Sequence, residues 1–133
     1  MSEDVYQQAI KDLAAVAAGR LDAPDTSVTL DNPLCGDTVV LDLRLADGRI
    51  AALGHNVKGC LLCKAAAAVV ARSAVGLEAD AAAALADRVG AMLKQGGEPP
   101  IPALAAFLTV RPHKSRHGCV LLPFKALAKA LGR

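Results

Sequence analysis

The residues of this chain that can do chemistry are four thiols and one neighbouring carboxylate. Cys35 and Asp37 lie two residues apart, Cys60 and Cys63 lie three apart, and Cys119 stands alone near the C-terminus. Thiolates bind zinc and iron–sulfur clusters, and they are also the nucleophiles of sulfur transfer. Three thiolates with a carboxylate, or four thiolates, meet the four-coordinate demand of zinc or the ligation of a cluster.

The positions of these thiols favour their charged form. Cys60 follows a glycine and a predicted strand, at the predicted start of a helix, where unpaired N–H groups and the helix dipole stabilise a thiolate. Cys63 comes three residues later and therefore lies on the same helix face, one turn further along. Three cationic or potentially cationic residues precede Cys119 and are predicted to stabilise its thiolate: Lys114, Arg116 and His117.

The same cysteines and Asp37 also have purely structural interpretations. A cysteine in a helix rich in Ala and Leu is often a small buried hydrophobic residue, which for Cys63 is an equal alternative. Asp37 would then only cap the turn before a strand. For Cys35, Cys60 and Cys119 together the structural interpretation is weaker, because each stands beside a glycine at the boundary of an element. Under the same interpretation, the three histidines are ordinary surface residues: His55, His113 and His117.

Composition and charge limit the class of protein. The 133 residues suit one domain, spanning 1–133, with a core of its own. With one Tyr, two Phe and no Trp, that core must be aliphatic. All 13 acidic residues lie at or before Glu98, and six cations follow it. No aromatic platform accompanies this basic segment, so we expect no nucleic acid as partner. A solvated helix face, or binding to an acidic partner protein, explains the basic segment better than nucleic-acid binding does.

The chain carries no sign of export or membrane insertion. Its first residues are acidic, no apolar signal region follows, and no apolar run reaches the length of a membrane span. We therefore expect a cytoplasmic protein without a membrane partner. Cysteines in that compartment more often bind metal or catalyse than form disulfides.

Periodicity predicts a helix, then strands, in the N-terminal half. A helix is expected between Ser2 and Gly19, with an apolar stripe of four residues: Tyr6, Ile10, Leu13 and Ala17. Strands follow over 26–31, from Thr38, and over 49–57, with Asp47-Gly48 as the turn of a hairpin. One face of this small antiparallel sheet should be buried by Val39, Leu41, Leu43 and Leu45, with Asp42 and Arg44 on the other.

Helical spacing returns after the sheet. Helices are expected from Cys60, over 78–95 with Gly96 as the stop, and at the C-terminus, where Phe124, Leu127 and Leu131 share a face. A short apolar segment over 103–110 lies between prolines. The predicted class is α+β: an N-terminal helix, a small three-stranded antiparallel sheet, and helices packed on one face.

These motifs together resemble the IscU/NifU-type iron–sulfur cluster assembly scaffold family. The family pattern is a Cys-Gly-Asp turn, a Gly-Cys at a helix start, and a third cysteine opening the last helix, as at Cys35, Cys60 and Cys119. The resemblance implies the same α+β fold. It also implies that these three cysteines hold a transient iron–sulfur cluster or zinc, with Asp37 as a further ligand or an aid to release and Cys119 as the sulfur acceptor. Cys63 is an alternative ligand.

Details place the resemblance nearer the zinc-binding SufU-like branch. That branch has an arginine three residues before the last cysteine, as Arg116 stands here, and a long step between the second and third cysteines, here 59 residues from Cys60 to Cys119. Gly118 replaces the histidine of classical scaffolds. Pro123 should cost a helical hydrogen bond unless the last helix starts late.

Three functions remain open on the sequence. The first is a scaffold or sulfur acceptor, which is not itself an enzyme. It takes persulfide sulfur from a cysteine desulfurase and delivers to apo iron–sulfur recipient proteins. A close variant is a zinc-dependent sulfur-transfer partner of a desulfurase. The second is a thiol–disulfide oxidoreductase that uses Cys60 and Cys63, although its strands form a hairpin rather than a βαβ unit. The third is a zinc-stabilised binding module.

Overall fold

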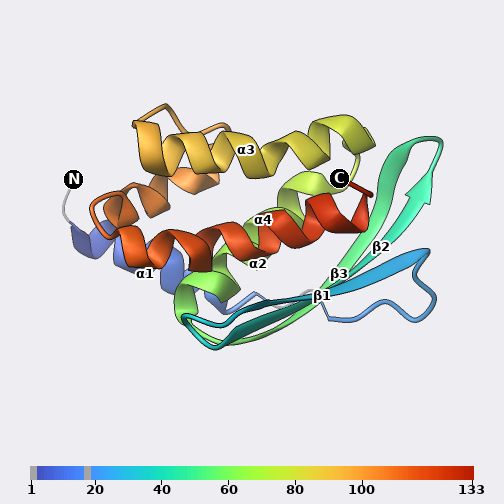
Figure 1. The fold of residues 1–133 in the computed structure, drawn as a ribbon, viewed down its shortest axis with the longest axis horizontal. Helices are drawn as coiled ribbons and strands as arrows, with labels where there is room; N and C mark the ends of the chain where they lie inside the picture. The colour runs from blue at the N-terminus through green and yellow to red at the C-terminus, as the bar shows by residue number, and fades with distance from the viewer. Residues whose placement is uncertain (1–2, 17–18) are drawn as a thin grey trace.

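The computed structural model describes residues 3–16 and 19–133, and it confirms the predicted α+β order. The helices gather on one face of a three-stranded sheet (Figure 1). The elements are α1 (Glu3–Ala14), β1 (Thr26–Asn32), β2 (Asp37–Ala46), β3 (Arg49–Lys58), α2 (Leu61–Ala74), α3 (Ala79–Gln95), the 3₁₀ helices η1 (Pro102–Val110) and η2 (Lys114–Arg116), and α4 (His117–Ala130).

The sheet is antiparallel in the order β1-β2-β3. Asp47 and Gly48 both have positive φ, at 54° and 75°, which is the two-residue turn that the sequence predicts. Val39, Leu41 and Leu43 are fully buried on the face toward the helices. Leu45 was predicted to join them and does not. A register shift between Arg44 and Leu45 turns the strand, and Leu45 is 40% exposed.

The opposite face of the sheet is covered where the connector before β1 crosses it. Asp42, predicted on the polar face, is fully buried there. Its carboxylate accepts hydrogen bonds from Arg20 Nε at 2.6 Å, Ser27 Oγ at 2.6 Å and Leu21 N at 3.1 Å. Burial acts to raise the pKa of Asp42, but these bonds outweigh it and hold the pKa below its usual value. A side chain at Gly54 would collide with the connector backbone, so glycine is required.

The first helix is shorter than predicted. It ends at Ala14, and Gly19, the predicted stop, instead lies beside β3, where its carbonyl accepts a hydrogen bond from His55 N at 2.8 Å. Local sequence does not reveal this tertiary partner, so spacing alone indicates a helix terminator at this glycine. Ile10 and Leu13 are buried as predicted. Two residues of the predicted helix lie outside the described residues: Ser2 and Ala17.

The later helices begin and end largely as their boundary residues predict. Cys60 is the N-cap of α2, and Gly96 ends α3 in the left-handed conformation with φ 79°. Helix α4 begins at His117, so Pro123 lies inside it rather than ahead of a late start. Because proline has no N–H, the carbonyl of Cys119 lacks the helical donor that residue 123 would otherwise supply.

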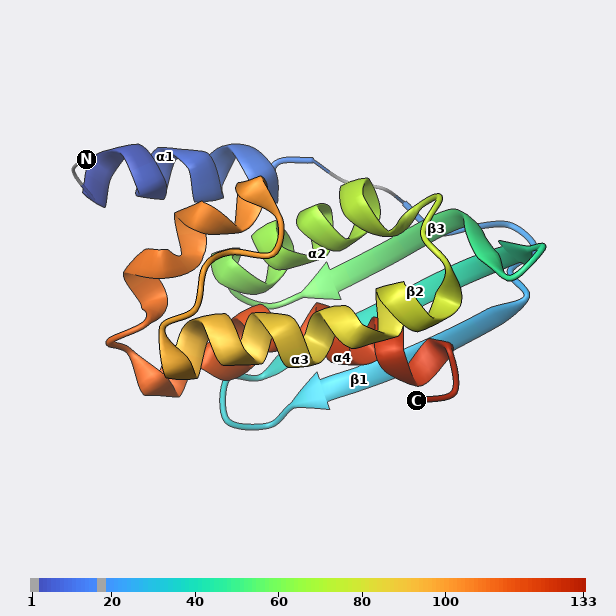
Figure 2. The same cartoon turned by 90° about the horizontal axis from the view of Figure 1, so that it is seen from above.

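Seen from above, α2, α3 and α4 lie over the sheet (Figure 2), and the buried side chains between these layers form the core. Its two phenylalanines, Phe107 and Phe124, are fully buried among aliphatic residues. Helix α2 packs against α1, α4 and β3, and its alanines allow this close approach from several sides. In the part of the chain that the structure describes, no helix is both long and apolar enough to cross a bilayer.

Candidate metal and sulfur centre

The turn between β1 and β2 presents the first thiol to solvent. Asn32 organises this turn: its carbonyl accepts from Cys35 N at 3.2 Å and Gly36 N at 2.8 Å, and its side-chain Oδ1 accepts from Leu34 N at 3.2 Å. Gly36 takes a φ of 72°, in the left-handed region that glycine adopts without strain. Cys35, which precedes this glycine, is exposed.

Asp37 joins the turn to the start of α2. It is the first residue of β2, pairs with Asn32 in the sheet, and is 1% exposed. Its Oδ1 accepts from Cys60 N at 2.8 Å, and its Oδ2 accepts from Cys60 Sγ at 3.4 Å. The carboxylate therefore satisfies an N–H group at the end of α2 that has no partner within the helix. A Cβ on Gly59 would collide with Asp37 Oδ1, so glycine is needed there for close approach.

Cys119 completes the group from the first turn of α4. It is 3% exposed, and its thiol donates to Cys35 Sγ at 2.9 Å. The ligand atoms of Cys35, Asp37 and Cys119 all lie within 4.8 Å of one another, and Cys60 adjoins them through Asp37. Three soft sulfurs and one carboxylate oxygen fit four-coordinate zinc and also fit the ligation of an iron–sulfur cluster.

The protonation of Cys119 differs from the sequence prediction. Its pKa is raised rather than lowered, first by burial and then by hydrogen bonding with Cys35, Cys60 and Asp37. The cations expected to lower it are not among the groups that shift it. Lys114 and Arg116 are exposed. His117 was a candidate for this role or for the surface, but it is buried, and its Nε2 lies 3.1 Å from Val110 O and 3.0 Å from Arg111 O.

The fourth cysteine lies behind the group. Cys63 is fully buried in the hydrophobic core, where burial, with a smaller contribution from the charge of Asp37, raises its pKa to about 12. It is not among the three residues whose ligand atoms gather. His55, predicted at the surface, is buried as well, whereas His113 is exposed as predicted.

Two residues that support the site carried no role in the sequence analysis. A Cβ on Gly118 would lie 2.9 Å from Asn32 Nδ2, so this glycine lets α4 approach the turn and brings Cys119 to Cys35. Gly59 does the same for α2 and Asp37. The available signal was a glycine directly before each of Cys60 and Cys119.

Comparison with known proteins gives consistent matches. The model of the NifU-like N terminal domain family matches residues 3–118. The iron–sulfur cluster assembly scaffold protein IscU of Streptococcus pyogenes serotype M1 is 29% identical over 119 residues, covering 86% of this chain and 74% of that protein.

Solved structures show the same fold. The crystal structure of a nitrogen-fixing NifU-like protein (N-terminal) from Brucella abortus has a TM-score of 0.90 and 35% identity, covering 98% of this chain and 94% of that one. A candidate iron–sulfur cluster assembly scaffold protein for the SUF system from Fervidobacterium islandicum AW-1 has a TM-score of 0.86 at 23% identity, covering 98% and 99%, and supports the fold alone.

Proposed function

The chain belongs to the NifU-like N-terminal domain family, which is a family of iron–sulfur cluster assembly scaffolds, and from this premise we propose how it acts. Residues 1–133 act as one scaffold domain that takes persulfide sulfur from a cysteine desulfurase. A nascent cluster or metal is held by Cys35, Asp37, Cys60 and Cys119, and it is passed on to apo iron–sulfur recipient proteins.

One observation carries this proposal: three segments far apart in the sequence bring ligand atoms together. Cys35 Sγ, Cys119 Sγ and a carboxylate oxygen of Asp37 lie within 4.8 Å of one another, and the Cys60 thiol lies 3.4 Å from Asp37 Oδ2. An oxygen in place of a fourth sulfur suits a site that must also release its cargo. Carboxylate oxygen is a harder ligand than thiolate and matches the iron of a cluster less well, so its bond to iron is more easily exchanged.

The exposure of the two thiols supports an order for the sulfur transfer. Cys35 is exposed and Cys119 is 3% exposed, so incoming sulfur reaches Cys35 first. The Cys35 thiolate attacks the outer sulfur of the desulfurase persulfide, and the desulfurase cysteine leaves as a thiolate. The thiol of Cys119, whose sulfur is 2.9 Å away, then attacks the outer sulfur on Cys35 and passes its proton to Cys35 Sγ, to which it already donates. Cys35 leaves as a thiol, and Cys119 is the final sulfur acceptor.

A zinc-dependent sulfur-transfer partner is the second candidate. The same four residues would hold the ion, and zinc would supply stabilisation of their thiolates as a Lewis acid. Arg116, which stands three residues before Cys119 as in the SufU-like branch, is exposed and can contact a desulfurase.

The oxidoreductase alternative has little support. Cys63 is fully buried, and its pKa of about 12 keeps it protonated at neutral pH, whereas a resolving thiol must be reached and ionised. A redox titration should therefore find no reversible disulfide between Cys60 and Cys63.

Anaerobic purification with metal and acid-labile sulfide analysis tests the proposal. Bound iron and sulfide that disappear on changing Cys35, Cys60 or Cys119 to Ser would support the scaffold. Zinc without sulfide would support the transfer variant. If none of the three substitutions alters metal or sulfide content, both are wrong. Cys63→Ala is the matched control, because this thiol lies outside the group.

A further inference from the structure

A groove runs between α3 and α4, which lie side by side (Figures 1 and 2). It consists of two adjoining cavities of about 510 Å³ and about 450 Å³, which share Lys94, Leu121 and Lys125 in their walls. The floor is made of small and aliphatic residues: Ala83, Ala86, Gly90, Ala91, Leu121 and Ala128.

The residue pattern of α3 explains why the groove is hollow. Ala83, Ala86 and Gly90 recur at three and four residues, so this stretch of α3 carries nothing larger than a methyl group before Lys94 continues the same stripe. Even a Cβ on Gly90 would meet only Leu121 Cδ2, at an ordinary contact distance of 3.9 Å. The two helices touch along their length and yet leave room for side chains from outside.

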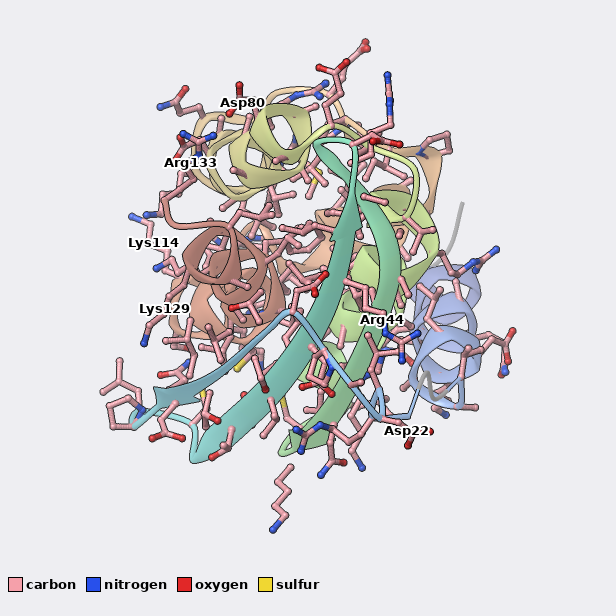
Figure 3. All side chains as sticks on the ribbon, turned by 90° about the vertical axis from the view of Figure 1, so that its right-hand side faces the viewer. Asp22, Arg44, Asp80, Lys114, Lys129 and Arg133 are labelled. Carbon is pink, nitrogen blue, oxygen red and sulfur yellow. The ribbon has the colours of Figure 1, made fainter. Side chains whose placement is uncertain are left out.

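Cations line the rim of this groove. Lys94, Lys114 and Lys125 form no ion pair among the described residues, and Arg133 pairs with Asp80. Asp87 is the acidic residue in the lining. Figure 3 shows Lys114 and Arg133 projecting on the side of the molecule where α4 lies. The positive excess means that an occupant with carboxylates would gain ion pairs here.

One end of the groove lies beside the candidate centre. Lys114, His117 and Gly118 line that end, and Gly118 directly precedes Cys119 in α4. A segment lying in the groove would therefore bring the rest of its own protein next to the cysteines.

We propose that the α3–α4 groove docks an acidic amphipathic helix of a partner protein. The helix lays aliphatic side chains on the small-residue floor and sets its carboxylates against Lys94, Lys114 and Lys125, as helices in grooves between helices do. Nucleic acid fits less well, because the lining has no aromatic side chain for a base to stack on and an apolar floor offers nothing to phosphate. This docking does not require any cargo on the cysteines.

A labelled synthetic helical peptide, with Leu along one face and Glu on the other, is the probe. Fluorescence anisotropy with the full chain should show binding that weakens about tenfold on Lys94→Glu and on Lys125→Glu. Gly90→Leu, which fills the floor without changing charge, should weaken it similarly. Lys129→Glu is the matched control: it is exposed on α4 outside the groove lining and should leave the affinity within about twofold.

Four outcomes would overturn the proposal. They are no binding by the unaltered chain, unchanged affinity in all three groove variants, an equal loss in Lys129→Glu, and tighter binding of a duplex oligonucleotide that depends on the same lysines. Circular dichroism of each variant verifies that it is folded, and the two lysine variants, both at exposed positions, test the groove even if Gly90→Leu unfolds. Repeating the titration with Cys35→Ala separates docking from cargo binding, since that variant should bind the peptide normally.

Discussion

At the scale of single residues, Asp37 connects the two halves of the candidate centre. Its carboxylate accepts from both the backbone N–H and the thiol of Cys60, and it lies in the same small volume as Cys35 and Cys119. A buried carboxylate needs such donors to offset the loss of water. Asp37 therefore positions α2 against the turn in addition to its proposed role as a ligand, and Gly59 makes the contact sterically possible.

Replacing Gly59 tests this arrangement. In Gly59→Ala the new methyl group occupies the place of Asp37 Oδ1, so the carboxylate must move away from Cys60. We expect zinc affinity, measured by competition with a chromophoric chelator, to fall by about tenfold to a hundredfold, as when a supporting residue of a metal site is lost. Gly97→Ala, where a Cβ meets nothing within 4 Å, should bind normally.

The double variant gives the sharper result. If Gly59→Ala acts by displacing Asp37, the double variant Gly59→Ala/Asp37→Ala should bind zinc nearly as well as Asp37→Ala alone. Losses that add in full would mean that the two residues act separately.

Cys63, unlike Asp37, is not expected to be a ligand, because it is buried in the core outside the group of ligand atoms. We expect Cys63→Ala to bind metal within about twofold of the unaltered chain, whereas Cys60→Ala should lose most binding. Cys63→Ser should bind metal but unfold about 1–3 kcal/mol more easily, because its hydroxyl is buried without an assured partner. Equal metal loss in Cys63→Ala and Cys60→Ala would make Cys63 a ligand after all.

The sequence predicted which cysteines lie together in the structure, but it did not predict the protonation state of their thiols. Glycines at element boundaries marked Cys35, Cys60 and Cys119, and these three lie at one place in the structure. The thiolate predicted at Cys119 is wrong for a physical reason. Cations close to Cys119 in the sequence do not lower its pKa, whereas burial, which no local pattern reveals, raises it.

At the scale of elements, the connector before β1 is held by one buried carboxylate. Asp42→Ala removes the acceptor for Arg20, Ser27 and Leu21, and we expect the free energy of unfolding at neutral pH to fall by about 2–3 kcal/mol in urea titrations. The folded pKa of Asp42 is below its usual value, so this contribution is complete above about pH 4 and is lost as pH falls further.

The control for that change is Asp31→Ala in β1. Asp31 is exposed and accepts one hydrogen bond, from Thr38 Oγ1 at 2.8 Å, so its loss should cost less than about 1 kcal/mol. A cost for Asp42→Ala no larger than this would show that the connector does not depend on the carboxylate.

His55 in β3 predicts a second pH effect, at higher pH. It is buried, its Nε2 has no hydrogen-bond partner among the described residues, and burial lowers its pKa. The unfolded chain therefore binds this proton more readily, and stability present above about pH 6.5 is lost as pH falls toward the lower folded pKa. We expect the free energy of unfolding of His55→Leu to depend less on pH between about 5 and 7. His113→Leu, at an exposed position, should keep the dependence.

Local chemistry predicted the elements, and long-range contacts decided where the prediction failed. The Asp47-Gly48 turn and the Gly96 cap depend on backbone conformations that a few adjacent residues determine, and both are confirmed. Gly19 and Leu45 depend on partners elsewhere: the former meets His55 of β3, and the latter follows a shift in pairing with β3. Neither partner can be found from spacing within one element.

At the scale of the whole molecule, the candidate centre lies at one edge of the core: Cys119 belongs to the core and Cys60 packs against it, whereas Cys35 is exposed. The turn that carries Cys35 lies at the end of the sheet opposite the Asp47-Gly48 hairpin (Figure 1). The core, with Phe107 and Phe124, fills the space between helices and sheet. Its apolar burial does not involve the exposed thiol of Cys35. A metal can therefore add to the stability of the fold without creating the fold.

Metal removal tests whether the core folds without the metal, and it distinguishes a scaffold from a zinc-stabilised module. After chelation we expect an unchanged far-ultraviolet circular dichroism spectrum and a cooperative thermal transition. The midpoint should drop by several degrees, since a ligand present at about a hundred times its Kd contributes about 3 kcal/mol. Cys35→Ala should melt at the same temperature with and without chelator, because it lacks a proposed ligand while its core is intact. Loss of helical signal on chelation would show that the metal is structural, and it would leave no empty form able to accept sulfur.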